Sequence, residues 1–459
     1  MGNSYDVIII GAGLSGLSAA HFLAKLSHAE LRVAVIEKTS RPGGAIKTFN
    51  SEGYQGEWGP HGFLDNTPES QELLRDIDLY REAQQAPLGD FFRYICHRGQ
   101  LERLPQSLST ALKTPLVSVG GKLRVFADLW KRPKMEDQTI ADWVNYRFGP
   151  AILPLADAAV SGTFAGDFNR LSIDAVMPGV RALEKETGSV LRGLIKKKRA
   201  ARGASKLARL PSMLNFPTGM ERLVKALAGK KEIKYNAAVK GIRRDKVWTV
   251  STEAGEFEAA QLIVALPVNQ ALRLLSAFKA PPVVEIPTAR IINVVMGLPD
   301  SAEVPYGFGY LAPEQEHRFA VGAMFTSHMF PDRSPRACRL IEVLVGGRRH
   351  PERLTLSDSE IEARAVKDIG ALINLPEPPL FIRVLRTEHA IPQLEMDHSA
   401  LLRWRQSVES DLTGLYICGF GWDGIGMNDM IKSARKTAAA AAAGGERWME
   451  ELQVKPVYF

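Results

Sequence analysis

Three glycines near the start of the chain stand at the spacing G-x-G-x-x-G, directly after an apolar run, Val7–Ile10. In this pattern the first glycine permits a tight turn, the second lets the backbone approach a pyrophosphate, and the third lets a helix pack closely on a strand. The free N–H groups at the start of that helix then face the phosphates. The motif predicts a dinucleotide site made by Gly11, Ala12, Gly13, Leu14, Ser15 and Gly16.

An acidic residue, Glu37, ends the next apolar run, Arg32–Ile36. Its carboxylate can accept hydrogen bonds from ribose hydroxyls, and it would repel the 2′-phosphate of NADP. Glycines recur shortly afterwards in Arg41–Gly44 and in Gly59–Gly62. The adjacent glycines of the first segment would again let backbone N–H groups approach a phosphate, whereas His61 taken alone also fits an ordinary surface turn.

A second glycine-rich segment lies close to the other end of the chain. A predicted buried strand, Leu415–Cys418, runs into Gly419–Gly426, and a helix is expected to begin around Met430 with Asn428 or Asp429 as its cap. The start of that helix would stabilise negative charge on a bound cofactor. Two such elements so far apart indicate one cofactor-binding domain with other units inserted into it.

A buried sheet covered by helices must position these motifs. Two short segments, Lys246–Ser251 and Glu256–Ala260, flank the turn-forming Glu253–Gly255 and predict a hairpin. Leucines recur at helical spacing between Leu108 and Trp130. The alanine run Ala438–Ala443 suits a helix packed on a sheet, with Gly444 as its stop. Other predicted elements are strands at Val7–Ile10, Ile263–Leu266, Ile291–Met296, Leu340–Val345 and Phe381–Leu385, and a helix at Asp358–Ile373.

Length and composition set outer limits on the molecule. A chain of 459 residues exceeds one hydrophobic core, so two or three structural units are expected. No apolar run is long enough for a transmembrane helix, and the first strand begins too early to leave room for a secretory leader. The three cysteines are widely spaced, which fits buried thiols in a reducing compartment rather than disulfides or a metal site.

The positive net charge is concentrated in one segment. Residues 181–210 hold ten basic residues against two acidic ones, which accounts for the +7 of the whole chain. Such a segment could meet an anionic membrane, a nucleic acid or an acidic ligand, or it could form a solvated helix face. The lack of interleaved aromatic residues argues against nucleic acid.

Taken together, the motifs resemble those of oxygen-dependent protoporphyrinogen oxidases of bacterial type, which belong to a larger group of FAD-containing oxidases. R-x-G-G at Arg41–Gly44 resembles the second signature of that larger group. Met430 stands where the narrower family usually has cysteine, a change between two soft side chains. The matching segments, in chain order, are Arg93–Ile95, Ser161–Asp167, Phe308–Pro313, Val345–Gly347, Ile391–Gln393 and Gly424–Ile431.

The resemblance implies an α/β fold of three units. A discontinuous, Rossmann-like FAD-binding domain would comprise residues 1–87, 211–275 and 391–459. A mixed-sheet substrate domain would comprise 88–100 and 276–390. A helical, membrane-associated domain would comprise 101–210 and would hold the basic segment.

Site residues carry over from the family by position. For the cofactor FAD, besides Gly11–Gly16, these are Glu37, Lys38, Arg41, Gly43, Gly44, Ala45, Gly59, Pro60, His61, Gly62, Val239, Phe420, Ile425, Gly426 and Met427. For the substrate, Arg93 matches an arginine that holds a propionate, which a guanidinium can do bidentately. Gly162, Leu311 and Leu344 match residues that line the cavity, although both leucines also suit an ordinary core. No catalytic side chain and no metal are expected, because the flavin carries the chemistry.

The implied activity is an FAD-dependent oxidation of protoporphyrinogen IX to protoporphyrin IX, in three two-electron steps with O2 reduced to H2O2. Coproporphyrinogen III is the alternative substrate, and its extra carboxylates should require more cations around the pocket. A flavoprotein that binds a tetrapyrrole without catalysis is an alternative of another class, and an amine oxidase is a more distant one. We expect a cytoplasmic protein held peripherally on the cytoplasmic face of an anionic membrane, and a homodimer is compatible with the sequence.

Overall fold

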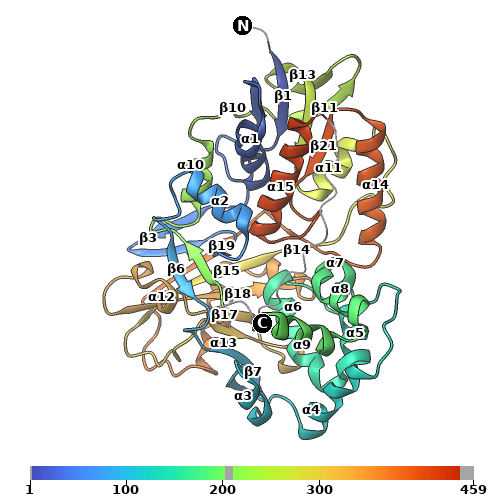
Figure 1. The fold of residues 1–459 in the computed structure, drawn as a ribbon. Coiled ribbons are helices and arrows are strands. Elements are labelled where there is room, and N and C mark those ends of the chain that lie inside the picture. Colours follow the sequence, from blue (N-terminus) through green and yellow to red (C-terminus); the bar gives the residue numbers. More distant parts are fainter. Residues whose placement is uncertain (1–2, 202–209, 445–459) are drawn as a thin grey trace.

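The computed structural model describes residues 3–201 and 210–444. Three units are visible in Figure 1: a sheet covered by helices at the top, a second sheet at the lower left, and a group of helices at the lower right. We call them the dinucleotide unit, the sheet unit and the helical unit. Segments from the two ends of the chain share the dinucleotide unit, where the blue helix α1 (Leu14–Leu26) packs beside the red helix α15 (Met427–Ala442).

The main sheet of the dinucleotide unit has seven strands in the order β10-β2-β1-β13-β12-β11, and β21 also pairs with β13. Five of its strands, β10, β2, β1, β13 and β21, are parallel neighbours, and the apolar runs of the last four are buried because helices cover both faces. The strands are β1 (Ser4–Ile10), β2 (Val33–Ile36), β10 (Glu232–Lys234), β11 (Val239–Arg244), β12 (Trp248–Thr252), β13 (Gly255–Ala265) and β21 (Leu415–Cys418).

Two helical layers enclose this sheet. Helices α1 and α15 pack against one face together with α2 (Pro68–Asp76) and α10 (Glu221–Ala228), and α11 (Val268–Leu275) and α14 (His398–Asp411) pack against the other. Small residues such as Ala19, Ala434 and Ala438 are fully buried in the first layer and allow α1 and α15 to approach closely. Smaller pairings join β3 (Thr48–Ser51) to β4 (Tyr54–Glu57), and β9 (Ser212–Asn215) to β5 (Phe63–Leu64) and β6 (Gln84–Pro87).

The sheet unit is a seven-stranded mixed sheet in the order β19-β15-β18-β17-β16-β7-β8. Its outer face packs on α13 (Asp358–Gly370), and the two share a buried apolar cluster. A short pair, β14 (Thr288–Ala289) with β20 (Ile391–Pro392), connects this unit to the first. The strands are β7 (Arg93–His97), β8 (Gln100–Arg103), β15 (Ile291–Pro299), β16 (Gly309–Leu311), β17 (Ala320–Met324), β18 (Cys338–Gly346) and β19 (Phe381–Arg386).

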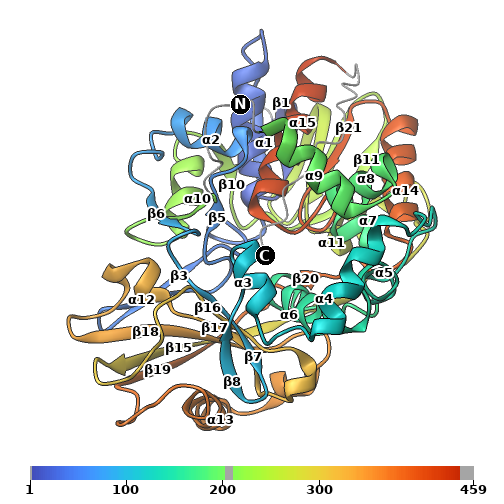
Figure 2. The same cartoon turned by 60° about the horizontal axis from the view of Figure 1, so that its bottom comes forward.

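The helical unit lies beside the sheet unit, and its helix α6 (Leu153–Phe164) contacts β16 and β17 (Figure 2). No helix in the described ranges, 3–201 and 210–444, is long and apolar enough to cross a membrane. The other elements are α3 (Leu108–Lys113), α4 (Val119–Val125), η1 (Phe126–Leu129), α5 (Ile140–Phe148), α7 (Ile173–Val176), α8 (Pro178–Thr187) and α9 (Val190–Ala201).

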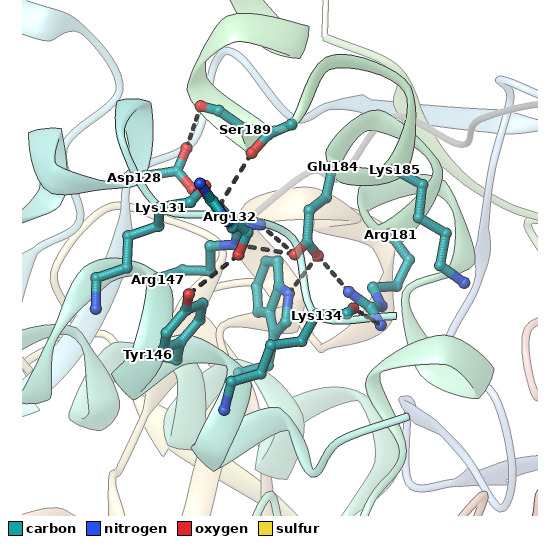
Figure 3. A network of polar contacts seen from close by, with 12 residues as sticks. Asp128, Lys131, Arg132, Lys134, Tyr146, Arg147, Arg181, Glu184, Lys185 and Ser189 are labelled. Atoms are coloured by element: carbon teal, nitrogen blue, oxygen red, sulfur yellow. Dashed lines mark hydrogen bonds and ion pairs between the residues drawn. The ribbon is translucent and has the colours of Figure 1, made fainter. Parts of the chain in front are cut away.

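Buried ion pairs hold this unit together (Figure 3). Arg147 on α5 lies between two carboxylates, with its Nη1 3.0 Å from Asp128 Oδ1 and its Nε 3.0 Å from Glu184 Oε1. The other oxygen of Glu184 accepts from Arg181 Nη1 at 2.6 Å and from Trp143 Nε1 at 2.7 Å. Because all these groups are buried, each charge depends on its partners for solvation.

Several sequence predictions differ from the structure in detail. Glu256–Ala260 and Ile263–Leu266 form one strand, β13, which pairs with β12 through its first half and with β21 through its second. Helix α15 begins at Met427, before the predicted Met430. The predicted boundary at residue 101 falls inside β8, which belongs to the sheet unit.

The basic segment 181–210 is also not a single solvated face. Arg181 and Glu184 are buried in the ion-pair network, whereas Lys185 and Glu186 on the same helix and the basic run Lys196–Arg199 on α9 are exposed. Residues 202–209 of this segment lie outside the described residues. The predicted amphipathic helices between residues 108 and 130 form as α3, α4 and η1, but Leu112, Leu123 and Trp130 are exposed rather than packed into a core.

Candidate active site

The first glycine motif forms the sharp connection between β1 and α1. Gly11 has φ +103°, and a Cβ at Gly16 would lie 1.9 Å from the carbonyl oxygen of Gly11. A Cβ at Gly13 would meet no protein atom within 4 Å, so the backbone there is open to a ligand. Ser15, in the first turn of α1, is buried and its Oγ has no hydrogen-bond partner in the described structure.

The loop after β2 lies against this motif. The N–H of Gly43 donates to the carbonyl of Ala12 at 2.8 Å, and the two glycine segments are bridged at Gly13 and Gly43. Arg41 donates from Nη2 to the carbonyl of Gly44 at 2.6 Å and from Nη1 to those of Pro42 and Ile46 at 3.1 Å each. The Arg41 side chain therefore shapes the loop. A Cβ at Gly43 would lie 2.6 Å from Val224, whereas one at Gly44 would meet only Gly13 Cα, at 3.7 Å.

Glu37 lies at the far end of the cradle, where the sequence predicts a ribose contact. Its Oε2 accepts from the N–H of Ala12 at 2.9 Å and its Oε1 from the N–H of Thr39 at 2.8 Å. These bonds orient the carboxylate and leave acceptor capacity for a hydroxyl. The N–H of Ala237 donates to the carbonyl of Glu37, which places the segment leading to Val239 nearby, while Lys38 is exposed.

The Gly59–Gly62 turn connects this cradle to the C-terminal motif. A Cβ at Gly59 would lie 2.3 Å from the carbonyl oxygen of Ala45, so the turn lies directly on the first loops. On the other side, Asn428 of α15 donates from Nδ2 to the carbonyl of Leu64 at 2.9 Å. The turn, which includes Pro60 and His61, thus lies between the two halves of the predicted cofactor site.

The start of α15 faces this turn. Asp429 accepts from the N–H of Gly426 at 3.2 Å and caps the helix, whereas Asn428 binds the neighbouring segments instead. Met427 is buried in the same core as Phe63, and Ile425 packs on the core of the helical unit. Phe420 lies where β21 ends, and its carbonyl accepts from the N–H of Val268 at 3.0 Å.

The inner face of the sheet unit completes the site. In the strand register Leu311 pairs with Gly322, Gly322 with Leu344, and Leu344 with Asn293, so these residues share one face. The adjacent row on that face runs from Arg93 through Gly309 and Met324 to Glu342. The structure therefore places the predicted substrate residues Arg93, Leu311 and Leu344 on one surface.

Gly162 reaches the same surface from the helical unit. A Cβ at Gly162 would lie 2.5 Å from Cδ2 of Leu311, so only glycine lets α6 approach this leucine. Arg93 is partly buried, its Nε has no hydrogen-bond partner among the described residues, and burial lowers the pKa of its guanidinium. An incompletely paired, partly buried cation of this kind favours an anionic group from a ligand.

These residues fit an FAD molecule. The open backbone at Gly13, the unpartnered Ser15 Oγ and the start of α1 suit its pyrophosphate, and Glu37 suits a ribose. Gly59–Gly62 and the start of α15 would hold the isoalloxazine ring. Among the described residues no group of His, Cys, Asp and Glu could hold a metal ion.

Comparison with known proteins defines the class. Residues 14–442 match the model of the family described as flavin containing amine oxidoreductase, so the chain belongs to that family. It is an FAD-dependent oxidase, and the predicted cofactor and resemblance are confirmed.

Two relatives and one solved structure show which members of the family this chain resembles. The chain is 28% identical to protoporphyrinogen oxidase of Bos taurus, covering 94% of this chain and 97% of the relative. It is 24% identical to coproporphyrinogen III oxidase of Bacillus subtilis (strain 168), covering 95% and 97%. The crystal structure of a provisionally assigned protoporphyrinogen oxidase from Exiguobacterium sp. 255-15 has a TM-score of 0.80 at 21% identity, covering 95% of this chain and 98% of that one.

Sequence reasoning missed the polar residues on the inner sheet face. Glu342 and Asn293 lie in otherwise apolar strands, are 1% and 4% exposed, and contact His61. The available signal was a charged or amide side chain at an inward-facing position of a buried strand, which is costly without a partner.

Proposed function

We propose that the enzyme oxidises protoporphyrinogen IX to protoporphyrin IX. The observation that carries the proposal is the shared surface of Arg93, Leu311 and Leu344, which faces the cradle expected to hold the flavin ring. A porphyrinogen has a broad apolar macrocycle and propionates at one edge. Apolar side chains beside an incompletely paired guanidinium match that distribution.

The chemistry would remove six electrons in three steps. When bound, FAD would supply the hydride acceptor, and with O2 as the final oxidant the three two-electron steps would give three H2O2 for each macrocycle. Arg93 would bind a propionate and orient the ring, while Leu311 and Leu344 would exclude water. The start of α15 would stabilise negative charge at the cofactor.

The pairing of nearby cations favours this substrate over coproporphyrinogen III. Arg349, next to Gly162, binds Asp157 at 2.7 Å and donates to Ser161 Oγ at 2.5 Å. Arg348 binds Glu395 at 3.1 Å. Because these guanidinium groups already have carboxylate partners, they offer little to the additional carboxylates of the larger acid.

Anaerobic mixing tests the proposal. The purified protein would be mixed with protoporphyrinogen IX or with coproporphyrinogen III, with flavin bleaching recorded first and porphyrin fluorescence after air is admitted. We expect bleaching by the first compound and faster turnover with it. A clear preference for the second would show that coproporphyrinogen III is the substrate. Bleaching by neither would contradict the assignment of a tetrapyrrole substrate.

We also propose that the helical unit attaches peripherally to an anionic membrane, at the cytoplasmic face. Exposed apolar side chains gather on α4, on η1 and directly after η1, including Val119 at 74% and Trp130 at 77% exposure. Helix α9 lies against η1 and carries the exposed basic run Lys196–Arg199. Apolar side chains next to lysines are the pattern of interfacial membrane binding.

Vesicle sedimentation tests this attachment. We expect binding to vesicles that contain phosphatidylglycerol, weaker binding to pure phosphatidylcholine, and loss of binding as salt screens the charges. A Trp130→Ser and Val119→Ser double variant should bind less and keep its flavin. Equal binding of this variant and the parent protein would contradict the proposal.

A further inference from the structure

Four ionisable side chains lie together between the Gly59–Gly62 turn and the inner sheet face, and all but His61, which is 14% exposed, are buried. They are Glu57 on β4, His61 in the turn, Arg333 on η4 (Pro331–Arg333) and Glu342 on β18. Arg333 Nη1 lies 3.3 Å from Glu57 Oε1, and His61 Nε2 lies 3.0 Å from Glu342 Oε2. Neutral side chains surround them, namely Thr48, Asn215, Asn293 and Thr326.

Hydrogen bonds identify both acids as carboxylates. Glu342 accepts from four donors: His61, the N–H of Glu57 at 3.2 Å, Asn293 Nδ2 at 2.5 Å and Thr326 Oγ1 at 2.9 Å. Burial alone would raise the pKa of Glu342, but these partners hold it at about 2. Burial raises the pKa of Glu57, yet its side-chain contacts also come from donors, including the Met220 N–H at 3.0 Å.

The charge of the cluster then depends on His61. Two carboxylates and one guanidinium leave an uncompensated negative charge in a buried site, which is costly. A protonated His61 removes it. Burial lowers the pKa of His61, but the charge and hydrogen bond of Glu342, together with the charge of Glu57, outweigh burial and raise the pKa above its usual 6.5.

The position of His61 determines which side of the imidazole is available to a ligand. Its Nε2 is engaged by Glu342, whereas Nδ1 has no hydrogen-bond partner among the described residues, and the side chain is 14% exposed beside the buried Glu342. Gly59 on one side of the turn touches Ala45, and Leu64 on the other side binds α15. The exposed part of the imidazole therefore belongs to the cradle that fits FAD.

We propose that His61 is a flavin-contacting residue whose Nδ1–H stabilises the negative charge of the reduced cofactor, and that Glu342, which binds Nε2, is the positioning residue that favours the protonated imidazole. The assignment rests on the flavin site and not on the identity of the substrate. Its test uses no porphyrinogen, so it can fail or succeed separately from the proposed function.

Redox titration of the holoenzyme against a reference dye tests the proposal. His61→Gln should keep its FAD and lower the midpoint potential. We expect about a tenfold smaller equilibrium constant for reduction, which is ~30 mV for a two-electron couple. In Glu342→Gln the two largest contributions that oppose burial are lost and only the weaker charge of Glu57 remains, so the pKa of His61 should fall. Its potential should then drop towards that of the His61 variant as pH rises from 5 to 8, relative to the parent protein.

Thr326→Val provides the matched control. It removes the bond to Glu342 Oε1 but leaves the ion pair, so it should leave the potential and its pH dependence as in the parent protein. Unchanged potentials in both the His61 and Glu342 variants, with FAD still bound, would overturn the proposal. An equal shift in Thr326→Val would also overturn it, because packing rather than charge would then be the cause. If His61→Gln loses FAD, the pH dependence of Glu342→Gln decides.

Discussion

At the scale of single residues, the pairing of charge separates the arginines of this site. Arg348 and Arg349 lie near the substrate surface, but carboxylates already neutralise them. Arg93 is held on β7 with its Nε buried and unpartnered. Pairing, rather than the number of nearby cations, therefore selects the residue that is available to an acidic substrate.

Replacing Arg93 tests this selection. In Arg93→Ala the loss of a charge-assisted hydrogen bond, worth about 1.5–3 kcal/mol, should raise KM for protoporphyrinogen IX by roughly 10- to 100-fold. Bound FAD, measured by absorbance per protein, should not change. Arg93→Lys keeps the charge without the bidentate geometry, so its KM should lie between those of the parent protein and Arg93→Ala. Loss of FAD with an unchanged KM would refute the role.

At the scale of elements, buried charges join the helices of the helical unit alongside its apolar core. Arg147 on α5 connects η1 to α8 through Asp128 and Glu184. Burial would raise the pKa of Glu184, but Trp143, Arg147 and Arg181 together lower it below 4.5. A carboxylate with a lowered folded pKa stabilises the unit at neutral pH, and this contribution is lost as the pH falls below about 4.5 through the lowered value.

Arg147→Met should therefore be strongly destabilising. It leaves two buried carboxylates short of a cation, which costs about 3–5 kcal/mol of unfolding free energy. The matched control is Lys196→Met, which breaks the exposed pair with Glu186 and should cost less than about 1 kcal/mol. Urea denaturation followed by the fluorescence of the tryptophans would measure both. Equal stabilities of the two variants would contradict this account.

Local patterns predict the elements that depend on neighbours in sequence. The G-x-G-x-x-G turn, Leu415–Cys418 and the helix from Asp358 were all predictable because each is specified by its own residues. The division of β13 was misjudged because its first half alternates exposed and buried residues while its second half is buried throughout. One strand thus carries two patterns, since it has different neighbours along its length.

Residues that meet only in three dimensions were beyond local patterns. Arg181 is part of a basic run in sequence, and nothing near it indicates that Trp143 and Arg147 meet the same carboxylate, Glu184. Glu342 likewise meets His61 through the packing of two units. The cofactor residues could be predicted from the sequence because they follow a motif. The ion pairs of Glu184 and Glu342 follow no motif, so they could not be predicted.

At the scale of the whole molecule, the predicted cofactor and substrate site lies where the three units meet. The dinucleotide unit supplies the cradle, the sheet unit the opposite face, and the helical unit Gly162 and its neighbours. Bound FAD would touch segments from both ends of the chain, so its binding should stabilise the assembled fold more than any single unit.

Removing FAD tests this coupling. At a ligand concentration a thousand times Kd, binding adds about 4 kcal/mol to stability, so the apoprotein should melt at a distinctly lower temperature. Adding FAD should restore the melting temperature. FMN lacks the adenosine half that Glu37 and Gly11–Gly16 would hold, so it should restore little. Full recovery with FMN would show that the first motif contributes no binding.

The pairing of β13 with both β1 and β21 has a consequence for biosynthesis. The ribosome makes β1 first, but its partner β13 emerges only after the whole helical unit, and β21 and α15 emerge last. Until then the apolar strand β1 has β2 on one side but no strand on the other, and the flavin cradle lacks the segments contributed by β21 and α15. We expect this chain to load its cofactor only near or after release from the ribosome, and its early strands to depend on chaperones in the interval.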